Sequence, residues 1–136
     1  MQADWKLISL QEHIDSRGHL SVVENNQHLI PFDIQRVFWI YGIPQNSVRG
    51  GHAHKTCGEL LIALRGTVLV ELSDGKKRES FTLSHPNKGL YIPPNVWCDI
   101  SFPTEDAICL CLASEPYDAA GYIHNYAEFC QQLAQE

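Results

Sequence analysis

A pair of histidines, His52 and His54, lies in the segment of the chain with the greatest capacity for chemistry, RGGHAHKTCGE at residues 49–59. Residues two apart on a strand project to the same face, so we expect both imidazoles to point together. A turn at residues 56–58 then lets Glu59 face the same space. Imidazole titrates near neutral pH, so the pair predicts proton transfer. Isolated histidine pairs are often structural, but the complete spacing, closed by Gly66, favours a reactive site.

Two arginines provide specific groups for an anionic ligand on an acidic chain. Ten Lys and Arg residues stand against sixteen Asp and Glu residues, a formal net charge of −6. The sequence therefore lacks the basic stripe of a nucleic-acid surface. Arg17 lies in the motif DSRG just before an expected strand, and Arg49 precedes the histidine pair. The planar guanidinium suits phosphate oxygens, so these two residues predict a diphosphate site. By strict alternation, Arg49 shares its strand face with Gly51 and not with the histidines.

The elements that must position these residues are short strands. Runs rich in β-branched and aromatic residues recur between turn signals such as Asp74-Gly75, which is typical of a sandwich or closed barrel. The expected strands are residues 20–24, 36–41, 48–54, 59–65, 67–72, 78–84, 90–92, 97–102 and 107–113. Residues 125–135 repeat apolar positions at three- and four-residue steps, which predicts a helix capped by Asn125 and packed on the barrel. We expect one all-β domain over residues 1–136, with a short C-terminal helix.

Composition narrows the class of protein. The chain is 44% hydrophobic and 19% charged, which is ordinary globular composition. No apolar run reaches membrane-spanning length, and the N-terminus lacks the layout of a signal peptide. Five cysteines cannot all pair within one chain and match no zinc motif, so we expect buried thiols in a reducing cytoplasm. Five further histidines are expected at the surface: His13, His19, His28, His85 and His124.

The spacing HxH, four residues, Glu, six residues, Gly resembles the first signature motif of the cupin superfamily. The second motif of that superfamily, a Pro-x-Gly corner followed by a histidine, has a counterpart at residues 93–98. There Asn95 replaces the glycine, and Cys98 stands where the histidine would be. This resemblance implies a cupin fold, an RmlC-like jelly-roll barrel.

Longer stretches resemble one branch of the cupins, the WxcM-like nucleotide-sugar 3,4-ketoisomerases. They are residues 15–18, 36–41, 49–55, 90–94 and 115–126. The resemblance implies an isomerase that acts on dTDP-4-oxo-6-deoxy-glucose and moves the ketone from C4 to C3 by proton transfer between these carbons. It further implies a role in making 3-amino deoxysugars for surface glycans such as lipopolysaccharide O-antigen. It implies a homodimer, often with exchanged N-terminal strands, and no metal or other cofactor, while the charge and the apolar runs already argue against nucleic-acid and membrane partners.

The same resemblance assigns candidate roles to residues. His52 and His54 are the predicted catalytic pair, with His54 favoured as the base at C3 because it lies deeper if the strand enters the barrel from Arg49. The predicted substrate-binding residues are Arg17, Arg49, Tyr41, Tyr91, Glu59, Cys98 and Trp97. Family members carry histidine at the position of Cys98, often glutamine at that of Glu59, and tyrosine in the strand that here holds Phe38 and Trp39. Tyr41 and Tyr91 are the candidates to replace that tyrosine as a proton carrier.

Two other functions stay open at the level of sequence. His52, His54 and Glu59 could form the two-histidine, one-carboxylate face of a metal-dependent cupin, a dioxygenase or isomerase, with Cys98 as a fourth ligand. The departures at Phe38 and Cys98 also fit a sugar-nucleotide-binding cupin without catalytic activity.

Overall fold

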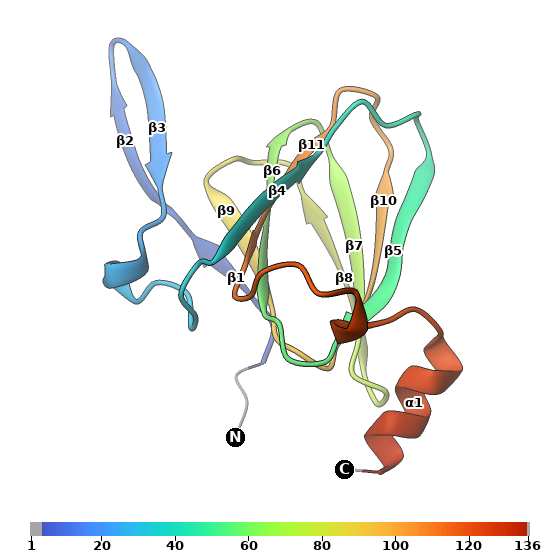
Figure 1. The fold of residues 1–136 in the computed structure, drawn as a ribbon. Coiled ribbons are helices and arrows are strands. Elements are labelled where there is room, and N and C mark those ends of the chain that lie inside the picture. Colours follow the sequence, from blue (N-terminus) through green and yellow to red (C-terminus); the bar gives the residue numbers. More distant parts are fainter. Residues whose placement is uncertain (1–3, 136) are drawn as a thin grey trace.

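Two five-stranded antiparallel sheets face each other and form a barrel in the computed structural model, which describes residues 4–135 (Figure 1). The first sheet has the order β1-β9-β6-β11-β4 and the second β12-β5-β10-β7-β8. The bounds in the first sheet are β1 (Lys6–Ser9), β9 (Lys88–Ile92), β6 (Glu59–Arg65), β11 (Ile108–Ala113) and β4 (Arg36–Ile40). Those in the second are β12 (Tyr122–Ile123), β5 (Ser47–His54), β10 (Trp97–Phe102), β7 (Val68–Ser73) and β8 (Arg78–Leu83). This architecture confirms the predicted all-β barrel.

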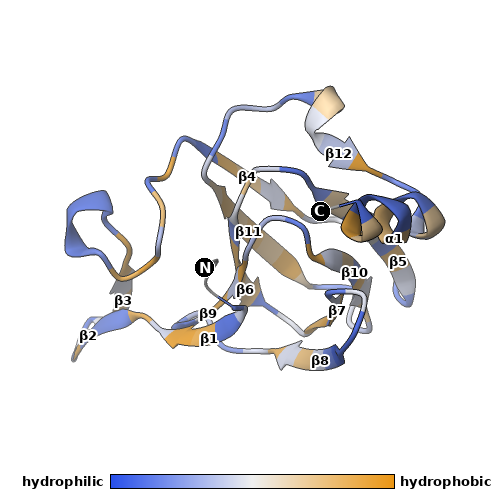
Figure 2. Ribbon diagram, turned by 90° about the horizontal axis from the view of Figure 1, so that it is seen from below, coloured by the Kyte–Doolittle hydropathy of each residue, from blue (hydrophilic) through white to orange (hydrophobic). Residues whose placement is uncertain are grey.

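Alternation along the strands fills the space between the sheets. On β7, Val68, Val70 and Leu72 are buried in the core, whereas Leu69 on the opposite face is exposed. A period of two residues is what a strand with one buried face requires. Viewed along the barrel, hydrophobic residues follow β10 and β11, which come from different sheets (Figure 2). The core therefore joins the two sheets and fixes the barrel around the strands that carry the candidate site.

A separate hairpin of β2 (Gln11–Asp15) and β3 (Gly18–Val22) projects away from the barrel (Figure 1). Ile14 and Leu20, one on each strand, are exposed apolar side chains. The sequence signals predicted part of β3 but neither β1 nor β2.

The C-terminal helix α1 (Tyr126–Ala134) packs against the second sheet, as the sequence predicted. The Asn125 side chain caps it by accepting a hydrogen bond from the Glu128 backbone N–H at 3.0 Å. Phe129 is buried against Trp97, with 5.9 Å between the ring centroids. The remaining short elements are two 3-10 turns, η1 (Asn25–Gln27) and η2 (Ala119–Gly121).

The cysteines behave as the composition indicated. All five are free thiols, and four of them are buried: Cys57, Cys98, Cys109 and Cys111. Within residues 4–135, no helix is both long and apolar enough to cross a membrane.

Candidate active site

A β-bulge in β5 determines which side chains face the interior of the barrel. Cys98 pairs with His52 and Asp99 pairs with Gly50, so Gly51 has no partner on β10. Gly51 has φ +64°, a left-handed conformation that glycine adopts without steric cost. The extra residue shifts the alternation, and Arg49 therefore lines the same cavity as His52. The expectation from strict alternation, that Arg49 faces away from the histidines, was wrong because it took β5 to be regular.

His52 and His54 point together, as their spacing predicted. Their ring centroids are 5.0 Å apart in an edge-to-face arrangement. His54 is 6% exposed and His52 is partly exposed, so His54 is the deeper of the pair, as expected. The His54 backbone carbonyl accepts a 2.8 Å hydrogen bond from the backbone N–H of Asn95, which has φ +62° and occupies the glycine position of the second motif.

Glu59 begins β6 and turns back toward the histidines. Its Oε1 lies 3.0 Å from His54 Nε2, with both side chains buried. The distance is that of a buried ion pair, although the Nε2–H is not well aligned for a hydrogen bond. Burial acts to raise the pKa of Glu59, but the proximity of His54 and the charges of His52 and Arg36 outweigh it and lower the pKa below its ordinary value. Glu59 is therefore an ionised carboxylate held against an imidazole, an arrangement that stabilises the imidazolium formed when His54 takes a proton.

The cavity next to these residues has a volume of about 360 Å³. This volume is in the range of small-molecule sites. Its lining comes from both sheets and consists of Phe38, Trp39, Ile40, Arg49, His52, Glu59, Leu61, Ile100, Cys111, Tyr122 and His124. A mostly apolar wall with a few convergent polar groups is typical of a site that excludes water from a reaction.

Three lining or neighbouring residues were missed at the level of sequence. Tyr122 lies against His54, with 4.4 Å between the ring centroids, and Arg36 Nη2 donates to its hydroxyl at 3.3 Å. His124 is exposed, as expected, but it lines the cavity and stacks on Tyr122 with centroids 5.6 Å apart. Tyr122 and His124 belong to a stretch that carried the family resemblance, and this was the available signal. Tyr122 also lines a small second cavity, which it shares with Arg36 and His54.

The structure places the other predicted binding residues away from this cavity. Tyr41 is exposed just beyond β4, Tyr91 packs with Phe32 in a separate apolar cluster, and Trp97 packs against α1. Arg17 lies at the tip of the β2–β3 hairpin, where it is almost fully exposed and pairs with Asp15 at 2.7 Å. Of the two arginines predicted to bind the diphosphate, a single chain therefore places Arg49 at the cavity and Arg17 away from it.

Cys98 lies in the barrel core, next to His52 in the register of β5 and β10. Burial raises the pKa of its thiol well above the ordinary value, and the charge of Glu59 adds to this effect. Cys98 is thus a neutral side chain at neutral pH.

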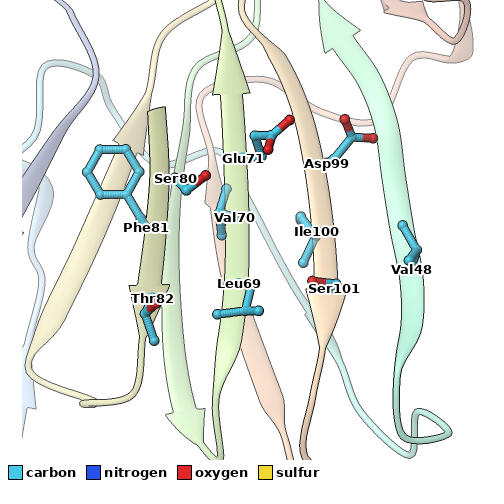
Figure 3. Close-up of a pocket in the computed structure, with 10 residues that line it drawn as sticks. All are labelled: Val48, Leu69, Val70, Glu71, Ser80, Phe81, Thr82, Asp99, Ile100 and Ser101. Carbon is cyan, nitrogen blue, oxygen red and sulfur yellow. The ribbon is translucent and has the colours of Figure 1, made fainter. Parts of the chain in front are cut away.

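A second hollow crosses the outer side of β8, β7, β10 and β5 (Figure 3). It is lined by hydroxyl, aliphatic and aromatic side chains with the carboxylates Glu71 and Asp99, and no histidine is among its described lining residues. Glu71 is paired with Arg78, and Asp99 accepts a 3.1 Å hydrogen bond from Trp97 Nε1. The chemistry of a proton-transfer site is therefore found at the histidine cavity and not in this hollow.

His52, His54 and Glu59 each offer one potential metal-ligand atom, and these atoms lie within 4.8 Å of one another. Two imidazoles and a carboxylate are a donor set that first-row divalent metals accept, so the residues present could hold such an ion.

Comparisons with known proteins identify the family of this chain. A family model described as "WxcM-like, C-terminal" matches residues 3–134. The TDP-4-oxo-6-deoxy-alpha-D-glucose-3,4-oxoisomerase of Aneurinibacillus thermoaerophilus is 39% identical over 129 residues, which cover 95% of this chain and 92% of that protein.

Solved structures of sugar 3,4-ketoisomerases have the same fold as this chain. QdtA, a sugar 3,4-ketoisomerase from Thermoanaerobacterium thermosaccharolyticum solved in complex with TDP, superposes with a TM-score of 0.92 at 36% identity, covering 99% of this chain and 98% of that chain. A histidine-to-asparagine mutant of QdtA was solved in complex with TDP-4-keto-6-deoxyglucose. WlaRB, a TDP-quinovose 3,4-ketoisomerase from Campylobacter jejuni, superposes with a TM-score of 0.89 at 42% identity, covering 93% of this chain and 97% of that chain. The predicted jelly-roll fold is thereby confirmed.

Proposed function

This chain belongs to the WxcM-like, C-terminal family, and we propose that it is an isomerase that converts TDP-4-oxo-6-deoxy-glucose to the 3-oxo-6-deoxy sugar. The observation that carries the proposal is the buried pair of His54 and ionised Glu59, of which Glu59 lines a cavity together with Arg49 and His52. Relatives and structural neighbours bear the names of TDP-sugar 3,4-ketoisomerases, which favours this function over a metal-dependent dioxygenase. A ketone at C3 prepares the sugar for amination at that carbon, so we place the reaction in the biosynthesis of 3-amino deoxysugars for surface glycans.

The reaction needs a base at C3 and a proton donor at C4. The C3 proton is acidified by the neighbouring C4 carbonyl, and a positioned acid–base group contributes about 10²–10⁴-fold in rate. We assign the base to His54 because the Glu59 carboxylate stabilises the imidazolium that forms. His52 lies 5.0 Å away, ring centroid to ring centroid, and faces the cavity where it orients the sugar. These groups suffice for proton transfer, and we propose that no metal takes part.

The TDP diphosphate is proposed to bind arginine at the cavity mouth. Arg49 lines the cavity through the bulge at Gly51, and its guanidinium matches phosphate oxygens in geometry and charge. Binding energy from the nucleotide, remote from the reacting carbons, then orients the sugar over the histidines.

We further propose a homodimer in which the N-terminal hairpins are exchanged. The hairpin exposes Ile14 (63%) and Leu20 (58%), and the edge strand β4 exposes Val37 (49%) and Trp39 (58%), which is more apolar surface than a lone chain needs to present. β4 is an edge strand with unpaired backbone groups, and such edges are usually covered. A symmetric exchange would bring Arg17 of the partner subunit toward the cavity and complete the diphosphate site.

The test is turnover of TDP-4-oxo-6-deoxy-glucose by the full chain, followed by proton NMR in deuterated buffer. We expect the 3-oxo product and exchange of the C3 proton with solvent. His54→Asn should abolish the exchange and leave TDP affinity nearly unchanged, whereas the matched control His85→Asn, at an exposed loop position, should retain full activity.

Two outcomes would contradict the proposal. TDP binding by the wild-type chain without turnover would indicate a binding protein without catalytic activity. Loss of turnover on chelation, with recovery on addition of iron, manganese or zinc, would make His52, His54 and Glu59 metal ligands.

A further inference from the structure

Tyr122 is placed against the histidine pair by a strand of only two residues. β12 pairs with β5, and Tyr122 lies directly opposite His54 in the register. Directly opposite residues of an antiparallel pair project to the same face. The Tyr122 ring is accordingly 4.4 Å from the His54 ring and 5.6 Å from the His52 ring, between centroids. The Tyr122 ring is therefore held against both histidines in the wall of the cavity.

Arg36 holds that hydroxyl from the opposite sheet. Its Nη2 donates to the Tyr122 oxygen at 3.3 Å, and its guanidinium lies over the rings of Phe38 (5.0 Å) and Tyr117 (5.6 Å). Among the described residues Arg36 has no carboxylate within ion-pair distance, and its buried Nε has no hydrogen-bond partner. Burial opposes the charge of Arg36, but Tyr122 together with the charges of Cys57 and Glu59 raises its pKa above the ordinary value. A permanent positive charge thus has the Tyr122 oxygen as its polar partner.

The proposed isomerisation moves two protons of different kinds. The first is the carbon-bound proton, which leaves C3 and is replaced by a proton arriving at C4, and His54 can transfer it. The other leaves the hydroxyl oxygen on C3 and arrives at the former carbonyl oxygen on C4. His54 holds the carbon proton throughout the intermediate and is not free to carry the oxygen proton, which therefore needs its own carrier.

We propose that Tyr122 is the catalytic residue that carries the oxygen proton, and that Arg36 is the residue that positions it. The inference rests on the proposed function. As His54 takes the C3 proton, the C–H electron pair forms a C3–C4 double bond and the carbonyl pair moves to the C4 oxygen, which takes the Tyr122 proton. Arg36 stabilises the resulting phenolate.

The second half of the reaction restores every group. The phenolate takes the proton from the oxygen on C3, and that O–H pair forms the new C3 carbonyl. The electrons of the C3–C4 double bond then take the proton from the His54 imidazolium at C4. Both residues end in their starting protonation states, so no co-reactant is required.

No other hydroxyl competes for this role within the described cavity. Tyr122 is the one lining side chain there with a hydroxyl group, because Phe38 and Trp39 have none and Tyr41 and Tyr91 lie elsewhere. The role of proton carrier, for which the sequence offered Tyr41 and Tyr91 as candidates, thus goes to a tyrosine of the C-terminal segment.

Tyr122→Phe tests the catalytic role because it removes the hydroxyl and keeps the ring that packs on His54. We expect kcat to fall by about 10²-fold or more, with KM and TDP affinity within about twofold of wild type. Tyr117→Phe is the matched control, since Tyr117 packs 5.8 Å from Tyr122 but is mostly exposed and does not line the cavity. This control should keep wild-type kcat.

Arg36→Lys tests the positioning role in a double-mutant cycle. It should lower kcat in the wild-type background and cause little further loss in the Tyr122→Phe background, because its effect passes through the hydroxyl. Melting temperatures of all variants show that each is folded.

The outcomes separate this inference from the proposed function. Wild-type turnover with an equally fast Tyr122→Phe variant would overturn the role of Tyr122, as would a rise in KM with kcat unchanged. Losses that add fully in the double mutant would overturn the positioning role of Arg36. A wild-type chain that does not isomerise the sugar would instead refute the proposed function.

Discussion

Gly66 forms the turn between β6 and β7, and its replacement by alanine should be one of the most damaging single-methyl additions to the barrel. Gly66 has φ +68°, and a Cβ there would lie 2.5 Å from Thr104 Oγ1, 2.7 Å from Asp106 Oδ1 and 2.8 Å from Ala107 Cα. Thr104 Oγ1 accepts a hydrogen bond from the Thr67 backbone N–H at 3.0 Å, so it cannot move away freely. The backbone at Ala107 cannot rotate away as a flexible side chain could.

The magnitude follows from two costs. A left-handed conformation costs an L-residue roughly 1–2 kcal/mol, and overpacking adds about 1–3 kcal/mol. Gly66→Ala should therefore destabilise the fold by about 2–5 kcal/mol. For a chain of this length about 4 °C of Tm corresponds to 1 kcal/mol, so we expect a loss of roughly 8–20 °C.

Gly42→Ala provides the matched control. Gly42 has nearly the same φ, +65°, but a Cβ there would meet no atom within 4 Å. It should therefore show only the conformational cost, about 1–2 kcal/mol or roughly 4–8 °C. Thermal unfolding followed by circular dichroism measures both. Equal losses in the two variants would show that the contacts at Gly66 contribute nothing and would refute the steric argument.

Two further predictions concern the diphosphate site. Arg49→Ala should raise KM and weaken TDP binding measured by calorimetry while kcat changes little, as expected when uniform binding is lost; unchanged TDP affinity would remove Arg49 from the site. If hairpins are exchanged, Arg17→Ala and His54→Asn chains that are mixed unfolded and then refolded together should regain about a quarter of the native sites. Half of the random dimers contain one chain of each variant, and each such dimer holds one native site. No recovery of low-KM activity would exclude a shared site.

The histidine pair and the helix could be predicted because each depends on local periodicity. His52 and His54 share a face through the two-residue period of a strand, and α1 follows the helical repeat from its cap at Asn125. Glu59 also lay where the turn at residues 56–58 indicated. These signals are contained within about a dozen residues of sequence.

The remaining features depend on contacts that local patterns do not encode. The orientation of Arg49 is reversed by a bulge, and the sequence Gly50-Gly51 does not reveal which residue is left unpaired. Tyr122 reaches the site through a two-residue strand that pairs with β5, far away in the sequence, and two residues are too few to show a period. The hairpin strand β2 is exposed along most of its length and so lacks the apolar alternation that identifies a strand.

Two departures from the expected family pattern, at Cys98 and Phe38, leave the charges next to the proposed proton carriers balanced. Before reaction each proposed proton carrier has one charged side chain against it, the Glu59 carboxylate beside His54 and the Arg36 guanidinium beside Tyr122. In the proposed intermediate His54 gains a proton and Tyr122 loses one, so the sum of the charges is again zero. A buried cluster that stays neutral avoids the cost of placing net charge in an apolar core.

A third histidine at position 98 would be able to add a positive charge to this cluster. Burial and the charge of Glu59 instead keep the Cys98 thiol protonated and neutral. Glu59 therefore keeps its strongest interaction with His54, and its carboxylate remains the counter-ion of the imidazolium in the intermediate. On this argument the missing histidine does not remove catalysis, because the oxygen proton is carried by Tyr122 and the carbon proton by His54, on the two adjacent strands β12 and β5.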